Sequence, residues 1–284
     1  MRRGAVFAAA TDQSASLRRY LRRGFPGCKC SAPHGPCAGG VITGEASPSY
    51  LADARVPAQL ERHLPGVKIL VVLREPVARC LSSYRHNYLS SLPPGQPPIP
   101  FETLARWDGE RVLEPCLAAH AASGGGRIDL AQCYREVSVE EQFREAHELG
   151  GRWSWGSVPQ AQRSVWRSMV GRSLFWAQLD SWASFRERGE LHVVWTEQLD
   201  ASAMQGVAEF LGLPRHAFDC GLRFNTSARP GYESALEQPT AAARQPPQEG
   251  PGWLRRFFAP HNARLAGQLL AGGSGAAPSW ASGE

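Results

Sequence analysis

Arg74 and Ser82 are the residues whose types and spacing best suit the binding of an anion. Arg74 follows an apolar, largely β-branched run, Ile69–Leu73, which predicts a short buried strand. Pro76 ends that strand and favours the first turn of a helix, so Ser82 is expected on this helix. Ligands of open α/β sheets bind beyond the carboxyl ends of the strands, and a guanidinium there suits a phosphate. The alternative is structural: an arginine that caps a strand and a serine on a solvated helix face.

The segment LREPVARCLSSY, Leu73–Tyr84, resembles the 3′-phosphate-binding segment of sulfotransferases that use 3′-phosphoadenosine 5′-phosphosulfate (PAPS). In that family an apolar strand is followed by Arg, by Asn, Asp or Glu, by Pro, and then by Arg and a Ser before an aromatic residue. The resemblance implies that Arg74 and Ser82 hold the 3′-phosphate of the nucleotide.

A second segment, VITGEASPSYL at Val41–Leu51, resembles the Gly-Glu-x-Ser-Pro-x-Tyr strand end that lines the acceptor site of the family. The matching positions are Glu45, Ser47 and Tyr50. Glu45 is the remaining carboxylate at a plausible distance to act as a general base; the equally weighted alternative is that it ties down the strand end through hydrogen bonds. Residues Pro57–Leu64 predict a helix. The strand end in Val41–Leu51, this helix and the strand Ile69–Leu73 would together form a βαβ crossover with parallel strands.

A third match lies in the second half of the chain, where the family has a helix, a short strand, a glutamate and a helix ending in FLGLP. Residues 160–188 are expected to form one long amphipathic helix, and Leu191–Trp195 a buried strand with Glu197 at its end. Ala203–Leu211 predicts a helix closed by Gly212.

The family places its final nucleotide-contacting loop where this chain reads RFNTSARPGY, residues 223–232. Arg223 and Asn225 lie in this loop, and Arg229 is the candidate nucleotide contact. Residues 253–270 resemble the terminal helix of the family.

The loop that holds the 5′-phosphosulfate in the family departs from its pattern here. Family members have a strand, a lysine with Gly-Thr-Thr, and then Ser-Leu; glycine lets backbone N–H groups approach the phosphate, and lysine stabilises the leaving group. After a candidate strand at Ala5–Ala10, this chain reads TDQSASLRRYL. Thr11 and Gln13 stand where the lysine and glycine are expected, and Asp12 adds a like charge. Either the loop is degenerate or the proper amino-terminal segment is missing, so we expect the chain as written to transfer sulfate very slowly or not at all.

Two of the seven cysteines, Cys116 and Cys133, bracket a glycine-containing segment and are a candidate disulfide if the protein matures in an oxidising lumen. They lie in a region, residues 91–158, that is expected to be loop-rich apart from a short helix at Phe101–Trp107. A separate cluster fits no familiar zinc spacing, so no metal is expected: Cys28, Cys30, Cys37 and His34.

Length and composition bound the class of protein. A chain of 284 residues with 43% hydrophobic residues is expected to bury one sizeable core. The formal net charge of +5 suits an anionic nucleotide or an acidic acceptor, but it is too small to indicate nucleic acid. No run of about 18 apolar residues is present, so no membrane span is expected in this chain.

The resemblance as a whole implies an α/β fold: a single P-loop-like domain, residues 1–284, with a central parallel sheet flanked by helices. Within it we expect a poorly matched segment 1–40, a core 41–270 and a disordered tail 271–284. The implied activity is transfer of a sulfuryl group from the co-substrate PAPS to a hydroxyl or amine, most often of a carbohydrate. Carbohydrate members work in the Golgi lumen, anchored in the membrane by an amino-terminal helix that this sequence lacks.

Two other functions compete with this one. A non-catalytic relative would keep the scaffold and bind a 3′-phosphoadenosine nucleotide or a glycan without turnover, and the missing lysine and glycine favour this alternative. An unrelated enzyme of nucleotide phosphates, such as a kinase, would need a Gly-rich loop ending in Lys-Ser/Thr, which the sequence lacks.

Overall fold

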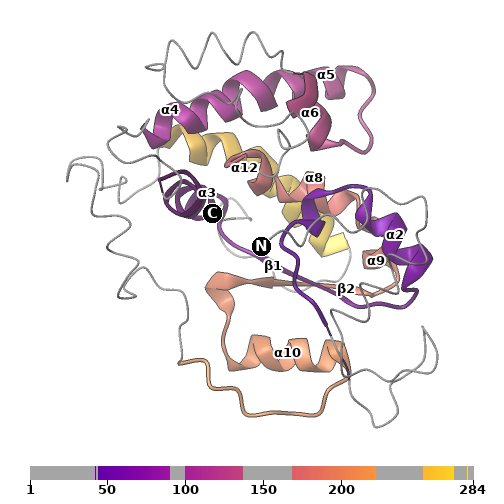
Figure 1. Cartoon of the computed structure of the whole chain (residues 1–284). Helices are drawn as coiled ribbons and strands as arrows, with labels where there is room; N and C mark the ends of the chain where they lie inside the picture. The colour runs from indigo at the N-terminus through magenta and orange to yellow at the C-terminus, as the bar shows by residue number, and fades with distance from the viewer. Residues whose placement is uncertain are drawn as a thin grey trace. The chain divides into compact units, whose positions relative to one another are not determined.

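The computed structural model of the chain describes residues 42, 44–89, 100–136, 168–221, 252–271 and 280. The chain divides into two compact units, Met1–Val67 and Lys68–Glu284. The described residues are mostly helical with a small parallel sheet, which is an α/β arrangement (Figure 1).

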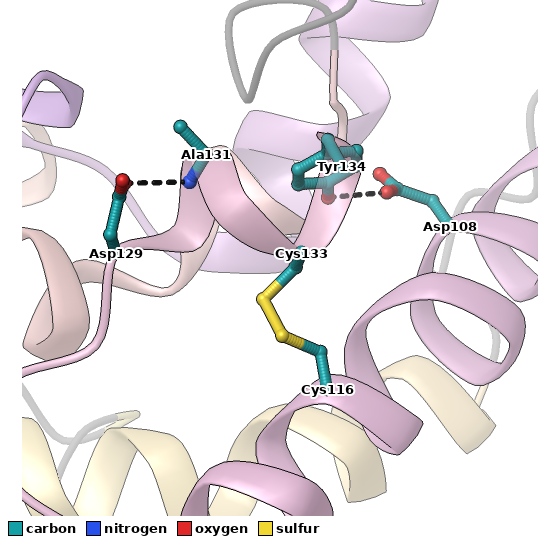
Figure 2. The surroundings of a disulfide bond; sticks show 6 residues. All are labelled: Asp108, Cys116, Asp129, Ala131, Cys133 and Tyr134. Atoms are coloured by element: carbon teal, nitrogen blue, oxygen red, sulfur yellow. Dashed lines mark hydrogen bonds between the residues drawn. A yellow bond between two sulfur atoms is a disulfide. The ribbon is translucent and has the colours of Figure 1, made fainter. Parts of the chain in front are cut away.

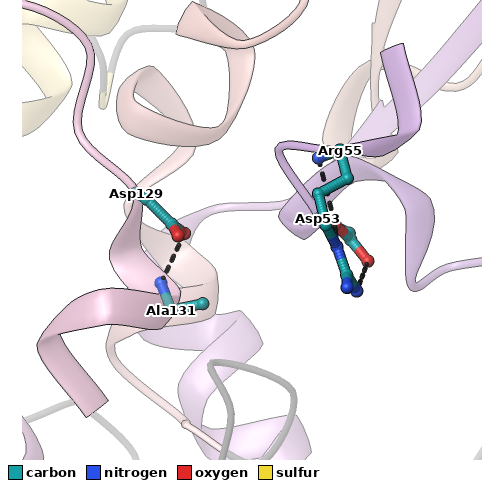
Figure 3. Close-up of polar contacts among 4 residues, drawn as sticks. All are labelled: Asp53, Arg55, Asp129 and Ala131. Atoms are coloured by element: carbon teal, nitrogen blue, oxygen red, sulfur yellow. Dashed lines mark hydrogen bonds and ion pairs between the residues drawn. The ribbon is translucent and has the colours of Figure 1, made fainter. Parts of the chain in front are cut away.

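The first unit contains η1 (Tyr50–Ala52) and α2 (Val56–His63). Asp53 leads into α2 by accepting hydrogen bonds from the Arg55 side chain at 2.8 and 2.7 Å and from its backbone N–H at 3.0 Å (Figure 3). This hydrogen bonding to Arg55 lowers the pKa of Asp53. The helix expected at Pro57–Leu64 is confirmed, but the expected strand end is wrong for Gly44–Ser47, which has no regular structure.

The sheet in the second unit pairs β1 (Ile69–Leu73) with β2 (Leu191–Trp195) in parallel, from Ile69 opposite Leu191 to Leu73 opposite Trp195. Both strands have the bounds that the sequence predicts. In β1, Val71 and Leu73 are buried while Leu70 and Val72 are exposed, because successive side chains of a strand point to opposite faces. Figure 1 shows the two strands side by side.

The chain leaves β1 through Arg74 and Glu75 and enters α3 (Pro76–Ser83), which continues as the π-helical turn η2 (Tyr84–Tyr88). The Glu75 carboxylate caps α3 by accepting from the backbone N–H groups of Val77 at 3.0 Å and Ala78 at 2.5 Å. A carboxylate at this position satisfies N–H groups that have no partner inside the helix. The helix expected after Pro76 is confirmed.

Residues 101–122 form one helical run, made of α4 (Phe101–Arg106), the π-helical η4 (Trp107–Leu113) and α5 (Glu114–Ala122). A glycine turn and α6 (Leu130–Glu136) follow. The loop-rich expectation for residues 91–158 is therefore wrong for the part that the structure describes, residues 100–136, and the short helix expected at Phe101–Trp107 is confirmed. In the turn Gly124, Gly125 and Gly126 all have positive φ, from 70° to 110°, a conformation that glycine adopts without steric cost.

Residues 168–187 do not form the single long helix expected for 160–188. They form three short elements: η8 (Gly171–Ser173), α8 (Phe175–Asp180) and α9 (Ala183–Glu187). The apolar residues of this segment are nevertheless buried, as the sequence indicated. Before η8, side chains from elsewhere in the chain bond the backbone of Met169 and Val170, and residues 168–170 are not helical.

Beyond β2 the chain forms η9 (Thr196–Gln198) and α10 (Ala201–Leu211). Asp200 caps α10 by accepting from the Ala203 N–H at 2.8 Å, and Gly212, at φ 76°, ends it. The α10 residue Phe210 stacks on His192 of β2, and its carbonyl accepts from Lys68 Nζ. The helix expected at Ala203–Leu211 is confirmed.

The long terminal helix α12 (Gly252–Ala271) contacts α8 and α3 and confirms the helix expected at 253–270. Its residue Trp253 lies against Gly109 of η4, where a Cβ atom would come within 3.4 Å of the indole ring. The core of the second unit is built from β1, α8, α9 and α12 together with the helical run. Its largest fully buried side chains are Trp182, Phe185, Phe258, Leu73, Leu113, Leu174, Leu179, Leu254, Leu265, Leu269 and Val170.

Candidate functional site

Arg74 lies directly beyond β1, at the carboxyl edge of the parallel sheet. Its side chain is exposed, and its guanidinium makes no hydrogen bond or ion pair with any residue that the structure describes. The alternation of β1 places it on the side of Leu70 and Val72 rather than in the core. An exposed arginine without such a partner keeps its five N–H donors available for a ligand.

The backbone on the carboxyl side of Arg74 is fixed by Glu75 and Pro76. The Glu75 N–H donates to Glu197 Oε1 at 2.8 Å, and Glu75 has an extended conformation, φ −46° and ψ 127°. Extended backbone is what a residue before proline favours. Glu197 lies in η9, just beyond β2, so the ends of the two strands are joined by this bond.

Ser82 is the seventh residue of α3 and is half-buried. Its hydroxyl makes no hydrogen bond with another described residue. Ser82 shares a helix face with the capping residue Glu75, because seven residues make about two turns. No described hydrogen bond joins Arg74 to Ser82; Arg74 lies directly beyond β1 and Ser82 lies on α3, the helix that follows.

Arg79 anchors α3 to the segment before η8. Its Nε donates to Ser173 Oγ at 2.5 Å, and its Nη2 donates to the carbonyl of Met169. Cys80 donates to the same carbonyl at 3.0 Å. Burial lowers the pKa of Arg79 and raises the pKa of the Cys80 thiol to about 11. Arg79 belongs to the sequence motif, but sequence reasoning gave it no role.

Asp108 of η4 is buried and is the centre of a second network, of which Figure 2 shows the bond to Tyr134. Its carboxylate accepts from Tyr134 Oη at 2.6 Å, from Ser168 Oγ at 2.6 Å and from the Val170 N–H at 2.7 Å. Burial raises the pKa of Asp108 while these donors oppose the rise. Gly171 packs directly against this network and leaves no room for a side chain, because a Cβ atom there would lie 2.3 Å from Tyr134 Oη. Asp108 and Arg79 thus bond neighbouring backbone groups of the segment before η8, the Val170 N–H and the Met169 carbonyl.

The disulfide expected from the sequence is present in the structure. Cys116 of α5 and Cys133 of α6 are joined with an S–S distance of 2.07 Å and a Cα–Cα distance of 5.5 Å, an ordinary separation for a disulfide. Cys133 immediately precedes Tyr134, so the bond fastens α6 next to the Asp108 network (Figure 2). Among the described residues Cys80 is a buried free thiol and Cys220 an exposed one.

Glu45, the candidate base, belongs to the first unit, whereas Arg74 and Ser82 belong to the second. It is exposed, and Ser47 Oγ donates to its Oε2 at 3.5 Å, a long hydrogen bond. The role of Glu45 as a base or as an acceptor contact stays a prediction.

Several expected site residues lie outside the described residues, so their roles also stay predictions. They are Arg223, Asn225, Arg229, the segment Ala5–Leu21 and the cluster of Cys28, Cys30, Cys37 and His34. Within the described residues no group of three or more His, Cys, Asp or Glu side chains is arranged to hold a metal ion. Of the helices described, none is long and apolar enough to cross a membrane.

Comparison with known proteins supports a sulfotransferase-like chain. The sequence is 23% identical over 204 residues to the membrane-associated sulfotransferase kil1 of Dictyostelium discoideum, a match that covers 61% of this chain and 43% of that protein. The chain thus spans less than half the length of this relative. No protein-family model matches the chain.

Proposed function

We propose that this protein is a PAPS-dependent sulfotransferase whose second unit binds the 3′-phosphate of the nucleotide through Arg74 and Ser82. The transferred sulfuryl group would go to a hydroxyl or amine of a carbohydrate-type acceptor. In such a reaction the acceptor oxygen or nitrogen forms a bond to sulfur, the bond from sulfur to the 5′-phosphate oxygen breaks, and 3′,5′-ADP leaves. The acceptor gives up its proton to a base, for which Glu45 is the candidate.

The observation that carries this proposal is the exposed Arg74 guanidinium, which has no partner among the described residues at the carboxyl edge of the sheet. Arginine forms bidentate, charge-assisted hydrogen bonds to phosphate, and this edge is where α/β sheets bind ligands. The Ser82 hydroxyl adds a neutral donor on the helix that follows. The similarity to a sulfotransferase agrees with this assignment.

We also propose that the protein works in an oxidising compartment such as the Golgi lumen. The Cys116–Cys133 disulfide supports this, because disulfides persist in oxidising compartments and are rare in the cytosol. The relative named above is described as membrane-associated.

A binding protein without turnover is the second candidate, and the residues Thr11, Asp12 and Gln13 favour it. They provide no cation at the place where the family uses a lysine. Losing one preorganised donor costs a factor of about 10²–10³ in rate.

Transfer of radiolabelled sulfate from PAPS to a panel of polysaccharides and phenols separates the two candidates. We expect little or no turnover from the chain as written, and turnover after a Lys-x-Gly-Thr segment is grafted ahead of Ser16. Robust turnover that Arg19→Ala abolishes would instead identify an arginine in the role of the lysine. If neither form turns over and the chain still binds 3′,5′-ADP, the non-catalytic candidate is favoured.

A further inference from the structure

We infer that Glu197 is a positioning residue of the nucleotide site, which sets the direction of Arg74 by fixing the backbone on its carboxyl side. This inference rests on the proposed function. The feature that carries it is the hydrogen bond from the Glu75 N–H to Glu197 Oε1, 2.8 Å long, between the ends of the two strands.

The need for this bond follows from Pro76. The proline ends the strand and leads directly into α3, so the Glu75 N–H lies beyond the last paired residues of the ladder, Leu73 and Trp195. Without Glu197 this N–H would have no protein partner among the described residues. The Glu197 carboxylate therefore takes the place of the next rung of the sheet.

The side chain of Glu75 fixes the same turn from the other direction, since it accepts from the N–H groups of Val77 and Ala78 at the start of α3. The backbone of Arg74 is therefore fixed on both sides. Leu73 before it is paired with Trp195 in the sheet, and Glu75 after it is hydrogen-bonded through its N–H and its carboxylate. The side chain of Arg74 is itself exposed and free of described partners. Such a guanidinium can be preorganised for a phosphate only through its backbone, and preorganisation lowers the cost of binding.

Two alternative roles for Glu197 give different expectations. If the carboxylate acts only through its negative charge, it repels a phosphate, and any neutral replacement tightens nucleotide binding. If it only stabilises the fold, its replacement weakens every nucleotide equally. A positioning role requires an acceptor atom in the right place, and it affects the 3′-phosphate alone.

Three variants separate these roles. Glu197→Gln keeps an acceptor oxygen at the same reach and removes the charge, Glu197→Asp keeps the charge and withdraws the acceptor by one methylene, and Glu197→Ala removes both. Glu187→Ala is the matched control, because Glu187 is an exposed acid at the end of α9 with no described hydrogen bond or ion pair. Glu197 is itself exposed, and thermal melting checks that each variant is folded.

The readout is calorimetric titration with 3′,5′-ADP and with 5′-AMP, which lacks the 3′-phosphate. We expect Glu197→Ala and Glu197→Asp to bind 3′,5′-ADP about tenfold more weakly, or about 1.4 kcal/mol, with 5′-AMP unchanged. Glu197→Gln and Glu187→Ala should bind both ligands as the unsubstituted protein does. Equal loss for both ligands, no loss in Glu197→Ala, or Gln and Ala variants that behave alike would each overturn the inference.

Amide hydrogen exchange distinguishes failure of this inference from failure of the proposed function. The Glu75 N–H should exchange slowly in the unsubstituted protein and in Glu197→Gln, and quickly in Glu197→Ala. If the protein shows no preference for 3′,5′-ADP over 5′-AMP, the proposed function falls, and the positioning role falls with it. If that preference exists but Glu75 exchanges equally fast in all forms, only the role of Glu197 is refuted.

Discussion

Arg74 and Arg79 have different surroundings although they lie on the same strand–turn–helix unit. Arg74 is exposed and free of described partners, whereas Arg79 is half-buried and bonds Ser173 and Met169. A guanidinium withdrawn from water needs hydrogen bonds to offset its desolvation, and the bonds of Arg79 tie α3 to the segment before η8. Arg74, whose guanidinium is exposed, is therefore the candidate ligand-binding residue of this unit.

His261 of α12 offers a prediction about pH at the scale of one residue. Its Nδ1 accepts from Trp176 Nε1 at 3.1 Å, and Arg264 lies over the Trp176 ring, 3.6 Å from its centroid. Burial, together with the positive charge of Arg264, lowers the pKa of His261 to about 4. An unfolded histidine titrates near 6.5, so between these values the unfolded state binds more protons than the folded state.

The stability contributed by neutral His261 is therefore complete above about pH 6.5 and is lost as the pH falls towards 4. We expect the loss to be about 1–2 kcal/mol, after allowance for the partial exposure of the ring. Urea unfolding at pH 7.5 and at pH 5 measures it, and His261→Gln should reduce the difference between the two pH values. His216→Gln, at an exposed position, serves as the control; an equal pH dependence in all three proteins would contradict the assignment.

At the scale of elements, the Asp108 network ties η4 and α6 to the segment before η8, the same segment that Arg79 of α3 bonds. Asp108→Ala would leave the Ser168 hydroxyl and the Val170 N–H without their acceptor, whereas the Tyr134 hydroxyl keeps Ser168 Oγ, 2.6 Å away, as an acceptor. Each buried donor left unpaired costs about 1–3 kcal/mol, so we expect a loss of about 3 kcal/mol or more in the free energy of unfolding.

Asp129→Ala is the matched control for Asp108→Ala, because Asp129 accepts from the Ala131 N–H at the start of α6 (Figure 3). Losing such a cap typically costs about 1 kcal/mol. Chemical denaturation compares the two variants. A loss for Asp108→Ala no larger than that for Asp129→Ala would show that the network does not support the fold.

The regular elements of the second unit follow from local sequence patterns. Ile69–Leu73 and Leu191–Trp195 are apolar runs with the length of strands, and Pro76 and Gly212 mark a helix start and a helix end. These signals lie within a few residues of the element that they define, which explains why the bounds are confirmed.

The absence of a helix at residues 168–170, just before η8, has no local signal of comparable strength. Asp108 bonds the Val170 N–H across 62 residues of sequence, and Arg79 bonds Met169 across 90. These contacts take up backbone groups that a continuous helix would use. Periodicity predicts which side chains are buried here, but it does not predict that tertiary hydrogen bonds replace the helical ones.

The same reasoning applies to the candidate site. Arg74 and Ser82 are recognisable from a motif of adjacent residues, and their positions relative to β1 and α3 agree with that motif. The role inferred for Glu197 depends on the pairing of two strands, because its hydrogen bond to the Glu75 N–H spans 122 residues of sequence. Sequence reasoning placed Glu197 at a strand end but assigned it no function.

At the scale of the whole molecule, the Cys116–Cys133 disulfide closes a loop with a sequence separation of 17. In the chain-entropy model a loop of this size contributes about 3 kcal/mol. The double variant Cys116→Ser/Cys133→Ser should lose about this amount in urea unfolding, whereas Cys220→Ser, at an exposed free cysteine, should lose little. Peptide mapping without reductant of protein from the secretory pathway checks the bond directly; two free thiols at these positions would contradict it.

The central proposal is that Arg74 binds the 3′-phosphate of a PAPS-type nucleotide. Calorimetric titration of Arg74→Ala with 3′,5′-ADP and with 5′-AMP tests it most directly, with Arg255→Ala, an exposed arginine of α12, as the control. A charge-assisted hydrogen bond contributes about 1.5–3 kcal/mol, so we expect Arg74→Ala to weaken 3′,5′-ADP by about 10- to 100-fold and to leave 5′-AMP nearly unchanged. Equal weakening of both ligands, or no weakening of 3′,5′-ADP, would contradict the claim.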